Sequence, residues 1–256
     1  YIKDYQAWKA SWEEIHSEIV HPEYEDGILY QSEVIHILNE HMDENSTVVH
    51  AAGGVPGDIH KLWKSKATAD YHSEYGYSCM GYEIAGALGI KMAAPDRDVY
   101  ALVGDGSYLM LNQDIVTSIQ EGIKLTIVLV DNHGFQCIRG LQTSCGGNEF
   151  GNEFRHREEE SQRLEGDFVE VDFCANAKSL GASVLQAKDE QSLIDALAKA
   201  KDQTRTTMIY VPVRRESNIP GYSWWDVPVS ASSNHPKVQQ ARQDLEEAKK
   251  NQRFYY

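Results

Sequence analysis

Two short segments carry side chains well suited to holding a metal ion. The first is Gly104-Asp105-Gly106-Ser107, and the second is Asp131-Asn132-His133-Gly134. Each segment follows an apolar run that is typical of a buried strand. The carboxylate of Asp105 and the amide oxygen of Asn132 are hard oxygen ligands of the kind that Mg²⁺ prefers. Because ligands bind at the carboxyl ends of strands in open α/β sheets, we expect the two segments to meet at such an edge.

The same segments suggest a phosphate ligand. Ser107 opens a predicted helix, and backbone N–H groups at a helix start favour phosphate. The chain has 39 acidic and 24 basic residues and a net charge of −15. A phosphate is therefore expected to be held by backbone dipoles or by a metal rather than by a basic patch. The segments lack the third glycine of a dinucleotide fingerprint and the Gly-Lys-Ser/Thr of a P-loop. They predict a magnesium–diphosphate site.

The paired segments resemble the diphosphate-binding signature of thiamine-diphosphate-dependent enzymes, in which Gly-Asp-Gly is followed, after a similar interval, by Asn-Asn. Asp131 stands where the first Asn usually lies, and Asn132 retains the second. The resemblance implies thiamine diphosphate and Mg²⁺ as cofactors. It implies that the metal is bound by Asp105, Asn132 and the backbone carbonyl of Gly134. The diphosphate would contact Gly104, Gly106 and Ser107.

Two further segments carry the resemblance. Residues 77–81 resemble the family segment in which an apolar side chain supports the bent cofactor, and by position that residue is Met80. The backbone carbonyl of Ser78 would accept a hydrogen bond from the aminopyrimidine ring. Gly53 and Gly54 fall where the family has another diphosphate-contacting loop. For Met80 the alternative is an ordinary place in the hydrophobic core.

Longer strings at 74–83, 104–110 and 151–155 resemble one branch of this family, the hydrolases of polyhydroxylated cyclohexane-1,2-diones in inositol catabolism. The resemblance implies hydrolytic C–C cleavage that opens the ring of a small cyclic dione. Two alternatives stay open. One is an acetolactate-synthase-like carboligase or a 2-oxoacid decarboxylase, which would share the cofactor site. The other is a non-catalytic fragment or subunit that binds only cofactor and partner chains.

Catalytic side chains are less clearly indicated. In the resembled family a glutamate from a pyrimidine-binding domain protonates the cofactor, and no residue here matches it. The resemblance therefore implies that this domain comes from the same or a neighbouring subunit of a homo-oligomer, and that the isolated chain is inactive. His72, His133 and Gln136 are candidates to contact the substrate, with surface or loop hydrogen bonding as the alternative.

Alternating patterns of helix and strand position these loops. The apolar spacing predicts helices over 32–42, 81–93, 109–120, 171–180 and 189–201. Unbroken apolar runs predict strands over 47–51, 99–103, 125–130, 182–185 and 207–213. Such strands, separated by helices, indicate an α/β fold with a mostly parallel sheet and helices on both faces. The resemblance implies that this is the thiamine-diphosphate-binding fold.

Composition and the residues that break helix and strand patterns suggest the organisation of the chain. We expect a connecting segment at 1–27, a diphosphate- and magnesium-binding domain at 28–215, and a tail at 216–256 with a charged helix near 237–250. The first residue is not methionine, so we expect an internal fragment. No apolar run approaches the roughly 20 residues that span a bilayer. The acidic charge disfavours nucleic acid and anionic membranes as partners. Four unpaired cysteines and no signal-like start suggest the cytoplasm.

Overall fold

The computed structural model describes residues 1–23, 26–74, 76–220 and 228–252. Within this part, six strands form one sheet in the order β2-β1-β3-β4-β6-β5, and every neighbouring pair is parallel. The strands are β1 (Ser46–His50), β2 (Tyr71–Ser73), β3 (Asp98–Gly104), β4 (Thr126–Asp131), β5 (Ser183–Gln186) and β6 (Thr207–Pro212). The predicted fold class, an α/β fold with a parallel sheet, is confirmed.

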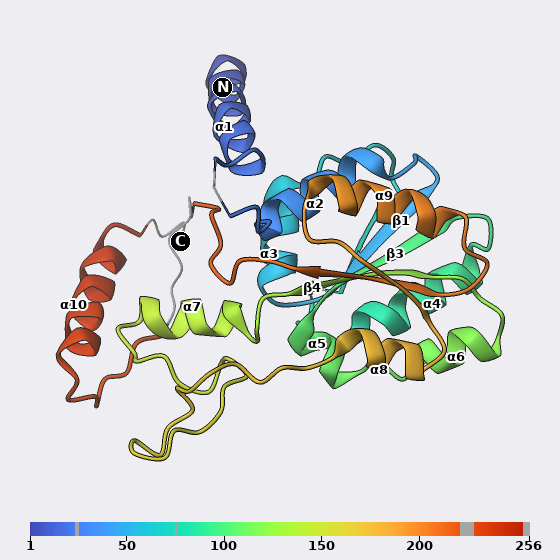
Figure 1. Ribbon diagram of the computed structural model, residues 1–256. Coiled ribbons are helices and arrows are strands. Elements are labelled where there is room, and N and C mark those ends of the chain that lie inside the picture. Colours follow the sequence, from blue (N-terminus) through green and yellow to red (C-terminus); the bar gives the residue numbers. More distant parts are fainter. Residues whose placement is uncertain (24–25, 75, 221–227, 253–256) are drawn as a thin grey trace. The chain divides into compact units, whose positions relative to one another are not determined.

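Helices cover both faces of this sheet, as predicted (Figure 1). One face carries α2 (Gln31–His41), α3 (Gly54–Leu62) and α9 (Glu190–Lys201). The other carries α4 (Tyr82–Ala93), α5 (Asp105–Met110), α6 (Asp114–Gln120) and α8 (Phe173–Ser179). Helices α3, α5 and α9 start within four residues of the ends of β1, β3 and β5, so these three connections are short.

The core consists of two apolar layers, one on each face of the sheet. Successive residues of β3 point to opposite faces, so Tyr100 and Leu102 pack under α2 and α3, whereas Ala101 and Val103 pack under α4. All four side chains are at most 2% exposed. Burial on both faces explains why the strands appear as continuous apolar runs in the sequence rather than as an alternating pattern.

The expected connecting segment contains a regular helix. Helix α1 (Ile2–Val20) has Ile19 and Val20 buried in the apolar layer of α2, and Asn218 donates a hydrogen bond to the Ile19 carbonyl. The N-terminal half of α1 leaves aromatic side chains exposed, with Trp8 at 69%. None of the helices described, α1 included, combines the length and apolar character needed to cross a membrane.

The described chain separates into two compact units. Unit 1 comprises residues 1–134 and 170–219, and unit 2 comprises 135–169 and 220–256, of which 221–227 and 253–256 lie outside the described residues. Unit 2 contains α7 (Gln136–Ser144) and the charged helix α10 (Pro236–Lys250), close to the predicted bounds. The division at residues 27 and 215 stays a prediction, and the structure adds a division at residue 134 that the sequence did not suggest.

One predicted helix is wrong in its extent. The chain over 109–120 forms the end of α5 and then α6, with Leu111 outside helical geometry between them. Helix α5 starts at Asp105, and the carboxylate of this residue accepts a hydrogen bond from the Gly106 N–H. The helix then breaks near Asn112, whose side-chain amide donates to Asn176 on α8. The predicted metal ligand Asp105 therefore lies at the junction between the end of β3 and the start of α5.

Candidate metal and diphosphate site

The predicted site residues gather at the carboxyl edge of four neighbouring strands in unit 1. The segment after β1 holds Gly53 and Gly54, the loop after β2 holds 76–81, the junction of β3 and α5 holds 104–107, and the end of β4 with the turn after it holds 131–134. Because β2, β1, β3 and β4 are adjacent in the sheet, these four connections emerge side by side. Parallel topology thus brings together segments that are up to 81 residues apart in sequence, from residue 53 to residue 134.

Three polar groups converge at the ends of β3 and β4. One end of the Asn132 side-chain amide lies 3.3 Å from Asp105 Oδ1 and 2.9 Å from the backbone oxygen of Gly134. Asp105 is only 1% exposed, and its second carboxylate oxygen is buried without a hydrogen-bond partner. Two arrangements satisfy this geometry. Either the amide is rotated so that its N–H₂ donates to both oxygens, or a cation is shared by all three.

The charges around Asp105 favour a cation. Burial, together with the neighbouring carboxylate of Asp131, raises the pKa of Asp105 to about 8. Asp131 is also buried; it accepts hydrogen bonds from the Tyr210 hydroxyl at 2.7 Å and from the His133 N–H at 3.1 Å. Two close buried carboxylates are costly to ionise together unless a positive charge joins them. The oxygen set of Asp105, Asn132 and Gly134 therefore fits Mg²⁺.

The backbone after β4 is shaped for this role. His133 has a φ of 65° and Gly134 a φ of 136°. Such angles are uncommon for a residue with a side chain and are readily adopted by glycine, which explains the glycine at 134. The turn directs the Gly134 carbonyl towards Asn132. The His133 side chain is 42% exposed, and its Nδ1 lies 3.7 Å from Asp131 Oδ1.

The loop before α4 is tied to the turn after β3. The Gly81 N–H donates to Ser107 Oγ at 2.7 Å, and that hydroxyl donates to the Glu83 carboxylate at 2.7 and 2.9 Å. Glu83 is 2% exposed, and burial raises its pKa. The Ser107 hydroxyl is thus engaged within the protein, and only its backbone remains for a diphosphate. Glu83 was not predicted to have a role; its position, four residues after an exposed Cys79, gave no signal of burial.

The remaining predicted residues lie as follows. Ser78 is exposed with a φ of 54°, and Met80 at the end of the same loop is half-buried. Gly53 has a φ of 126° directly before α3, whose first residue is Gly54. Gly104 ends β3, and Gly106 lies in the first turn of α5.

The two other substrate-contact candidates have protein partners. His72 lies in β2, stacks on Tyr82 and has Nε2 2.8 Å from the Tyr82 hydroxyl. Gln136 opens α7 in unit 2, and its amide donates to Glu153 at 3.2 Å. Gln136 thus belongs to unit 2, whereas the metal-site residues belong to unit 1.

Other metal and redox sites find no support in the described residues. No cluster of three or more His, Cys, Asp or Glu in this part has metal-binding geometry. All four cysteines lie in it and are free thiols, as predicted. The oxygen set at the ends of β3 and β4 is the candidate metal centre.

Comparisons with known proteins found relatives that match most of the chain. Residues 51–211 match the family model described as thiamine pyrophosphate enzyme, C-terminal TPP binding domain. The chain is 46% identical over 223 residues to 3D-(3,5/4)-trihydroxycyclohexane-1,2-dione hydrolase 2 of Bacillus cereus, and 44% identical over 217 residues to the corresponding hydrolase of Clostridium tetani. These matches cover 86% and 84% of this chain but only 35% and 34% of the relatives. The chain therefore spans about a third of the length of these relatives.

A solved structure with a similar fold is the thiamine diphosphate-dependent 4-hydroxybenzoylformate decarboxylase of Rhodococcus jostii RHA1. The TM-score is 0.64 over 77% of this chain and 35% of the other, with 17% sequence identity. At that identity the likeness supports the fold alone.

Proposed function

Because the chain belongs to the thiamine pyrophosphate enzymes, with their C-terminal cofactor-binding domain over residues 51–211, we propose that it supplies the diphosphate- and Mg²⁺-binding part of a cyclic-dione hydrolase. The observation that carries this proposal is the convergence of the Asp105 carboxylate, the Asn132 side-chain amide and the Gly134 carbonyl at the carboxyl edge of the sheet. The resemblance to the family signature implies the same three residues as metal ligands.

Each residue of the site has a definite task in this proposal. Asp105, Asn132 and the Gly134 carbonyl would hold Mg²⁺, whose positive charge would offset that of the diphosphate. The backbone of Gly106 and Ser107 in the first turn of α5 would bind the diphosphate. Met80 supports the bent cofactor from the loop that Ser107 and Glu83 hold in place. When bound, the cofactor supplies the electron sink for cleavage of a carbon–carbon bond.

The substrate follows from the relatives. Two of them, at 46% and 44% identity, are named trihydroxycyclohexane-1,2-dione hydrolases, and we infer hydrolytic ring opening of such a polyhydroxylated dione in inositol catabolism. The acid that acts on the aminopyrimidine would come from a pyrimidine-binding domain of the same or a neighbouring subunit. The proposal therefore includes a homo-oligomer whose site lies at an interface, acting in the cytoplasm.

The metal assignment is tested by isothermal titration of Mg²⁺ in the presence of thiamine diphosphate, comparing the wild type with Asp105→Asn. We expect the variant to lose more than about 100-fold in affinity, beyond the 10–100-fold that loss of an outer-shell partner costs. Asp195→Asn, on the exposed side of α9, is the matched control and should bind as the wild type does. An unchanged affinity in Asp105→Asn would overturn the assignment.

The substrate assignment needs the assembled enzyme. Loaded with thiamine diphosphate and Mg²⁺, it should consume the trihydroxylated dione and leave pyruvate unchanged. Consumption of pyruvate instead, with release of carbon dioxide or formation of acetolactate, would replace the hydrolase with a decarboxylase or a carboligase. The metal site would stand in either case.

A further inference from the structure

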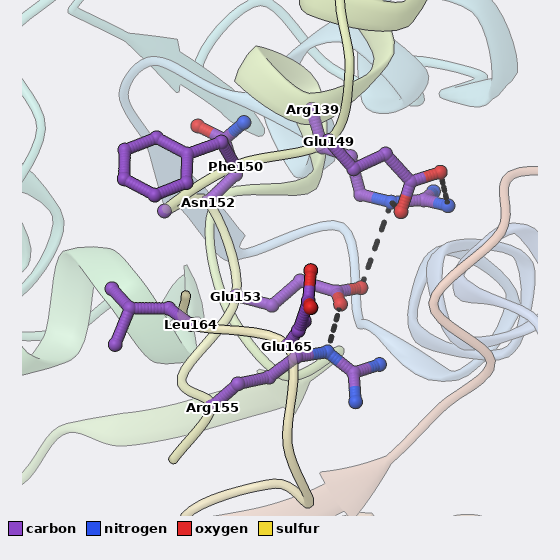
Figure 2. A pocket seen from close by; sticks show the side chains of 9 residues that line it. Arg139, Glu149, Phe150, Asn152, Glu153, Arg155, Leu164 and Glu165 are labelled. Carbon is purple, nitrogen blue, oxygen red and sulfur yellow. Dashed lines mark hydrogen bonds and ion pairs between the residues drawn. The ribbon is translucent and has the colours of Figure 1, made fainter. Parts of the chain in front are cut away.

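We propose that unit 2 contains a binding subsite for a neutral ring polyol. The subsite is a cavity of about 290 Å³, close to the lower end of known small-molecule sites (Figure 2). All the residues that line it come from the segment 139–165, so the cavity is internal to unit 2. No residue of the proposed metal site contributes to it.

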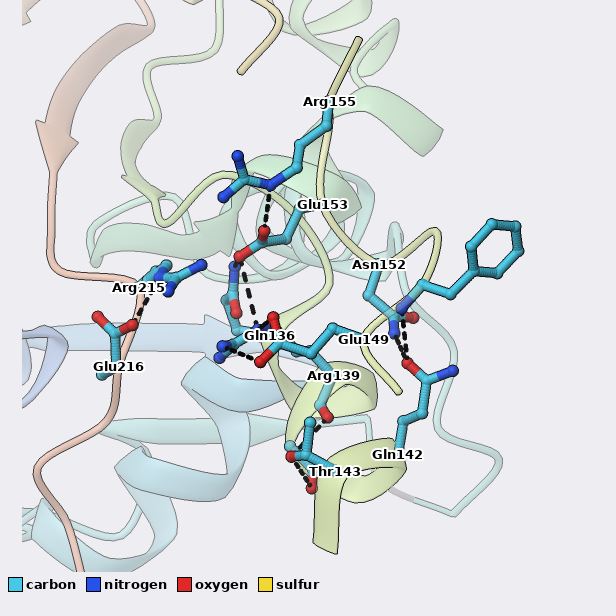
Figure 3. A network of polar contacts seen from close by, with 12 residues as sticks. Gln136, Arg139, Gln142, Thr143, Glu149, Asn152, Glu153, Arg155, Arg215 and Glu216 are labelled. Atoms are coloured by element: carbon cyan, nitrogen blue, oxygen red, sulfur yellow. Dashed lines mark hydrogen bonds and ion pairs between the residues drawn. The ribbon is translucent and has the colours of Figure 1, made fainter. Parts of the chain in front are cut away.

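A buried carboxylate between two guanidinium groups forms the polar wall. The Glu153 side chain is 8% exposed, with one oxygen 2.6 Å from Arg155 Nε and the other 3.6 Å from Arg139 Nε. Arg139 also binds Glu149 through two nitrogens, at 2.6 and 2.9 Å. Figure 3 shows these ion pairs as one connected network. The network fixes long side chains that would otherwise lose conformational entropy when a ligand binds.

The charges in this wall suit a neutral ligand better than an anion. Two arginines line the cavity, but so do three glutamates, Glu149, Glu153 and Glu165. A phosphate or carboxylate would compete with those carboxylates for the guanidinium groups. A hydroxyl group both donates and accepts, so it can bind the remaining N–H groups and the carboxylate oxygens together. Vicinal hydroxyls match the paired donors and acceptors of such a network.

Apolar side chains complete the cavity. Phe150 is 54% exposed although it lines the cavity, and Leu164 opposite the arginines is half-buried. A polyhydroxylated ring has an apolar C–H face as well as a polar rim, and an aromatic ring beside a charged wall fits both. The choice of a ring polyol over other neutral polyols rests on the proposed function.

Two hydrogen bonds join the cavity wall to residues 135 and 136, which directly follow the proposed metal ligand Gly134 in the sequence. The Phe135 N–H donates to the Asn152 carbonyl at 2.7 Å, and Gln136 donates to Glu153 at 3.2 Å. Residue 135 is bonded directly to Gly134. The segment 151–155, which carries the resemblance to dione hydrolases, contributes four of the nine lining residues: Gly151, Asn152, Glu153 and Arg155. We infer that this segment contributes to substrate specificity rather than to cofactor binding.

The test measures the binding of myo-inositol to the 256-residue chain by saturation-transfer difference NMR. We expect binding by the wild type and a roughly tenfold weaker affinity in Glu153→Gln, the usual effect of losing a charge-assisted hydrogen bond. Phe150→Ala should weaken binding roughly fivefold, and because this side chain is largely exposed the variant should fold normally. The matched controls, Glu160→Gln and Ile138→Ala, change exposed residues of unit 2 outside the cavity and should bind as the wild type does.

The outcomes separate this inference from the proposed function. If myo-inositol fails to bind, or binds equally to the wild type and both cavity variants, the subsite is wrong even when Mg²⁺ and thiamine diphosphate bind normally. Displacement of myo-inositol by equimolar inorganic phosphate would identify an anion site and also overturn it. If the polyol binds as expected while the assembled enzyme leaves the dione intact, the subsite stands and the proposed reaction falls.

Discussion

Several ionisable side chains of unit 1 are buried in surroundings that disfavour their charged forms. His50, the last residue of β1, has no exposed surface and packs against the rings of His60 and Tyr71. Burial, with a smaller contribution from His60, lowers its pKa to about 4. The pKa of Asp105 is raised for the same reason, because burial disfavours the charged form of either group. These shifts make the stability of the chain depend on pH.

His50 should make the protein less stable in acid. Its folded pKa lies below the ordinary value of 6.5, so the unfolded chain binds the proton first. The stabilising contribution is present above pH 6.5 and is lost as the pH falls towards 4, with an upper size of about 3 kcal/mol. His50→Phe should retain most of the aromatic packing and lose less stability between pH 7 and pH 4 than the wild type. Urea unfolding at the two pH values measures this.

The exposed His156 provides the control for that series. His156→Phe should leave the change in unfolding free energy between pH 7 and pH 4 as it is in the wild type. An equal change in the wild type and in His50→Phe would show that the buried imidazole does not govern acid stability.

Ser107 should matter for stability even without a cofactor. Ser107→Ala leaves the Gly81 N–H without its acceptor and the buried Glu83 carboxylate without its donor. We expect a loss of about 1–3 kcal/mol in the free energy of unfolding of the cofactor-free chain. Ser179→Ala, at an exposed helix end, should change it by less than about 0.5 kcal/mol. A cofactor-free Ser107→Ala chain as stable as the wild type would mean that the hydroxyl serves a ligand alone.

At the scale of elements, the turn between the loop 76–80 and α4 depends on one glycine. Gly81 has a φ of 89°, and a Cβ placed there would lie 2.8 Å from the Leu111 side chain. Position 81 therefore favours glycine for two reasons: its backbone is left-handed, and a larger side chain would collide with Leu111 between α5 and α6. This turn sets the position of Met80 relative to the turn after β3.

Gly81→Ala should therefore be destabilising. We expect a loss of at least about 1 kcal/mol, measured by chemical denaturation, because both the backbone angle and the contact with Leu111 are strained. Gly89→Ala, on the exposed side of α4 with open space around it, should instead stabilise the helix by roughly 0.5–1 kcal/mol. Similar effects of the two substitutions would contradict this account of the turn.

Helices and strands with strong apolar patterns could be predicted from the sequence. Strand β4 and helix α9 lie within one residue of their predicted bounds because burial imposes a clear pattern on them. Helix α3 and strand β2 were not predicted, since the glycines at 53, 54 and 57 suggested only a loop and β2 has three half-buried residues. Helix α7 has no buried residue, so it left no core pattern to detect.

The candidate site could be predicted in part for a related reason. Strand-end loops in parallel sheets converge, so spacing alone placed Asp105 and Asn132 together. The partners of the adjacent Asp131 and Ser107 could not be predicted, because Tyr210 lies 79 residues after Asp131 in the chain and Glu83 reaches Ser107 from α4. Such contacts depend on side-chain packing between distant elements.

At the scale of the whole molecule, the functional groups divide between two units. Unit 1 contains the sheet and the oxygen set at its carboxyl edge, and unit 2 contains the cavity lined by residues 139–165. The chain covers only 35% and 34% of the length of its two named relatives. Within the proposed function, the remaining two thirds would include the domain that supplies the acid for the aminopyrimidine ring.

The 256-residue chain should therefore bind its ligands without turning them over. With saturating thiamine diphosphate and Mg²⁺, we expect no ring opening of the trihydroxylated dione above the rate without protein, because the chain offers no residue that matches the family's protonating glutamate. Addition of the missing domains should restore hydrolysis, and Asp105→Asn in the restored enzyme should abolish it again. A spectrophotometric assay of dione loss measures both, with protein mass verified by mass spectrometry. Full turnover by the verified chain alone would mean that a group within residues 1–256, with Glu83 the first to test, performs the task assigned to the other domain.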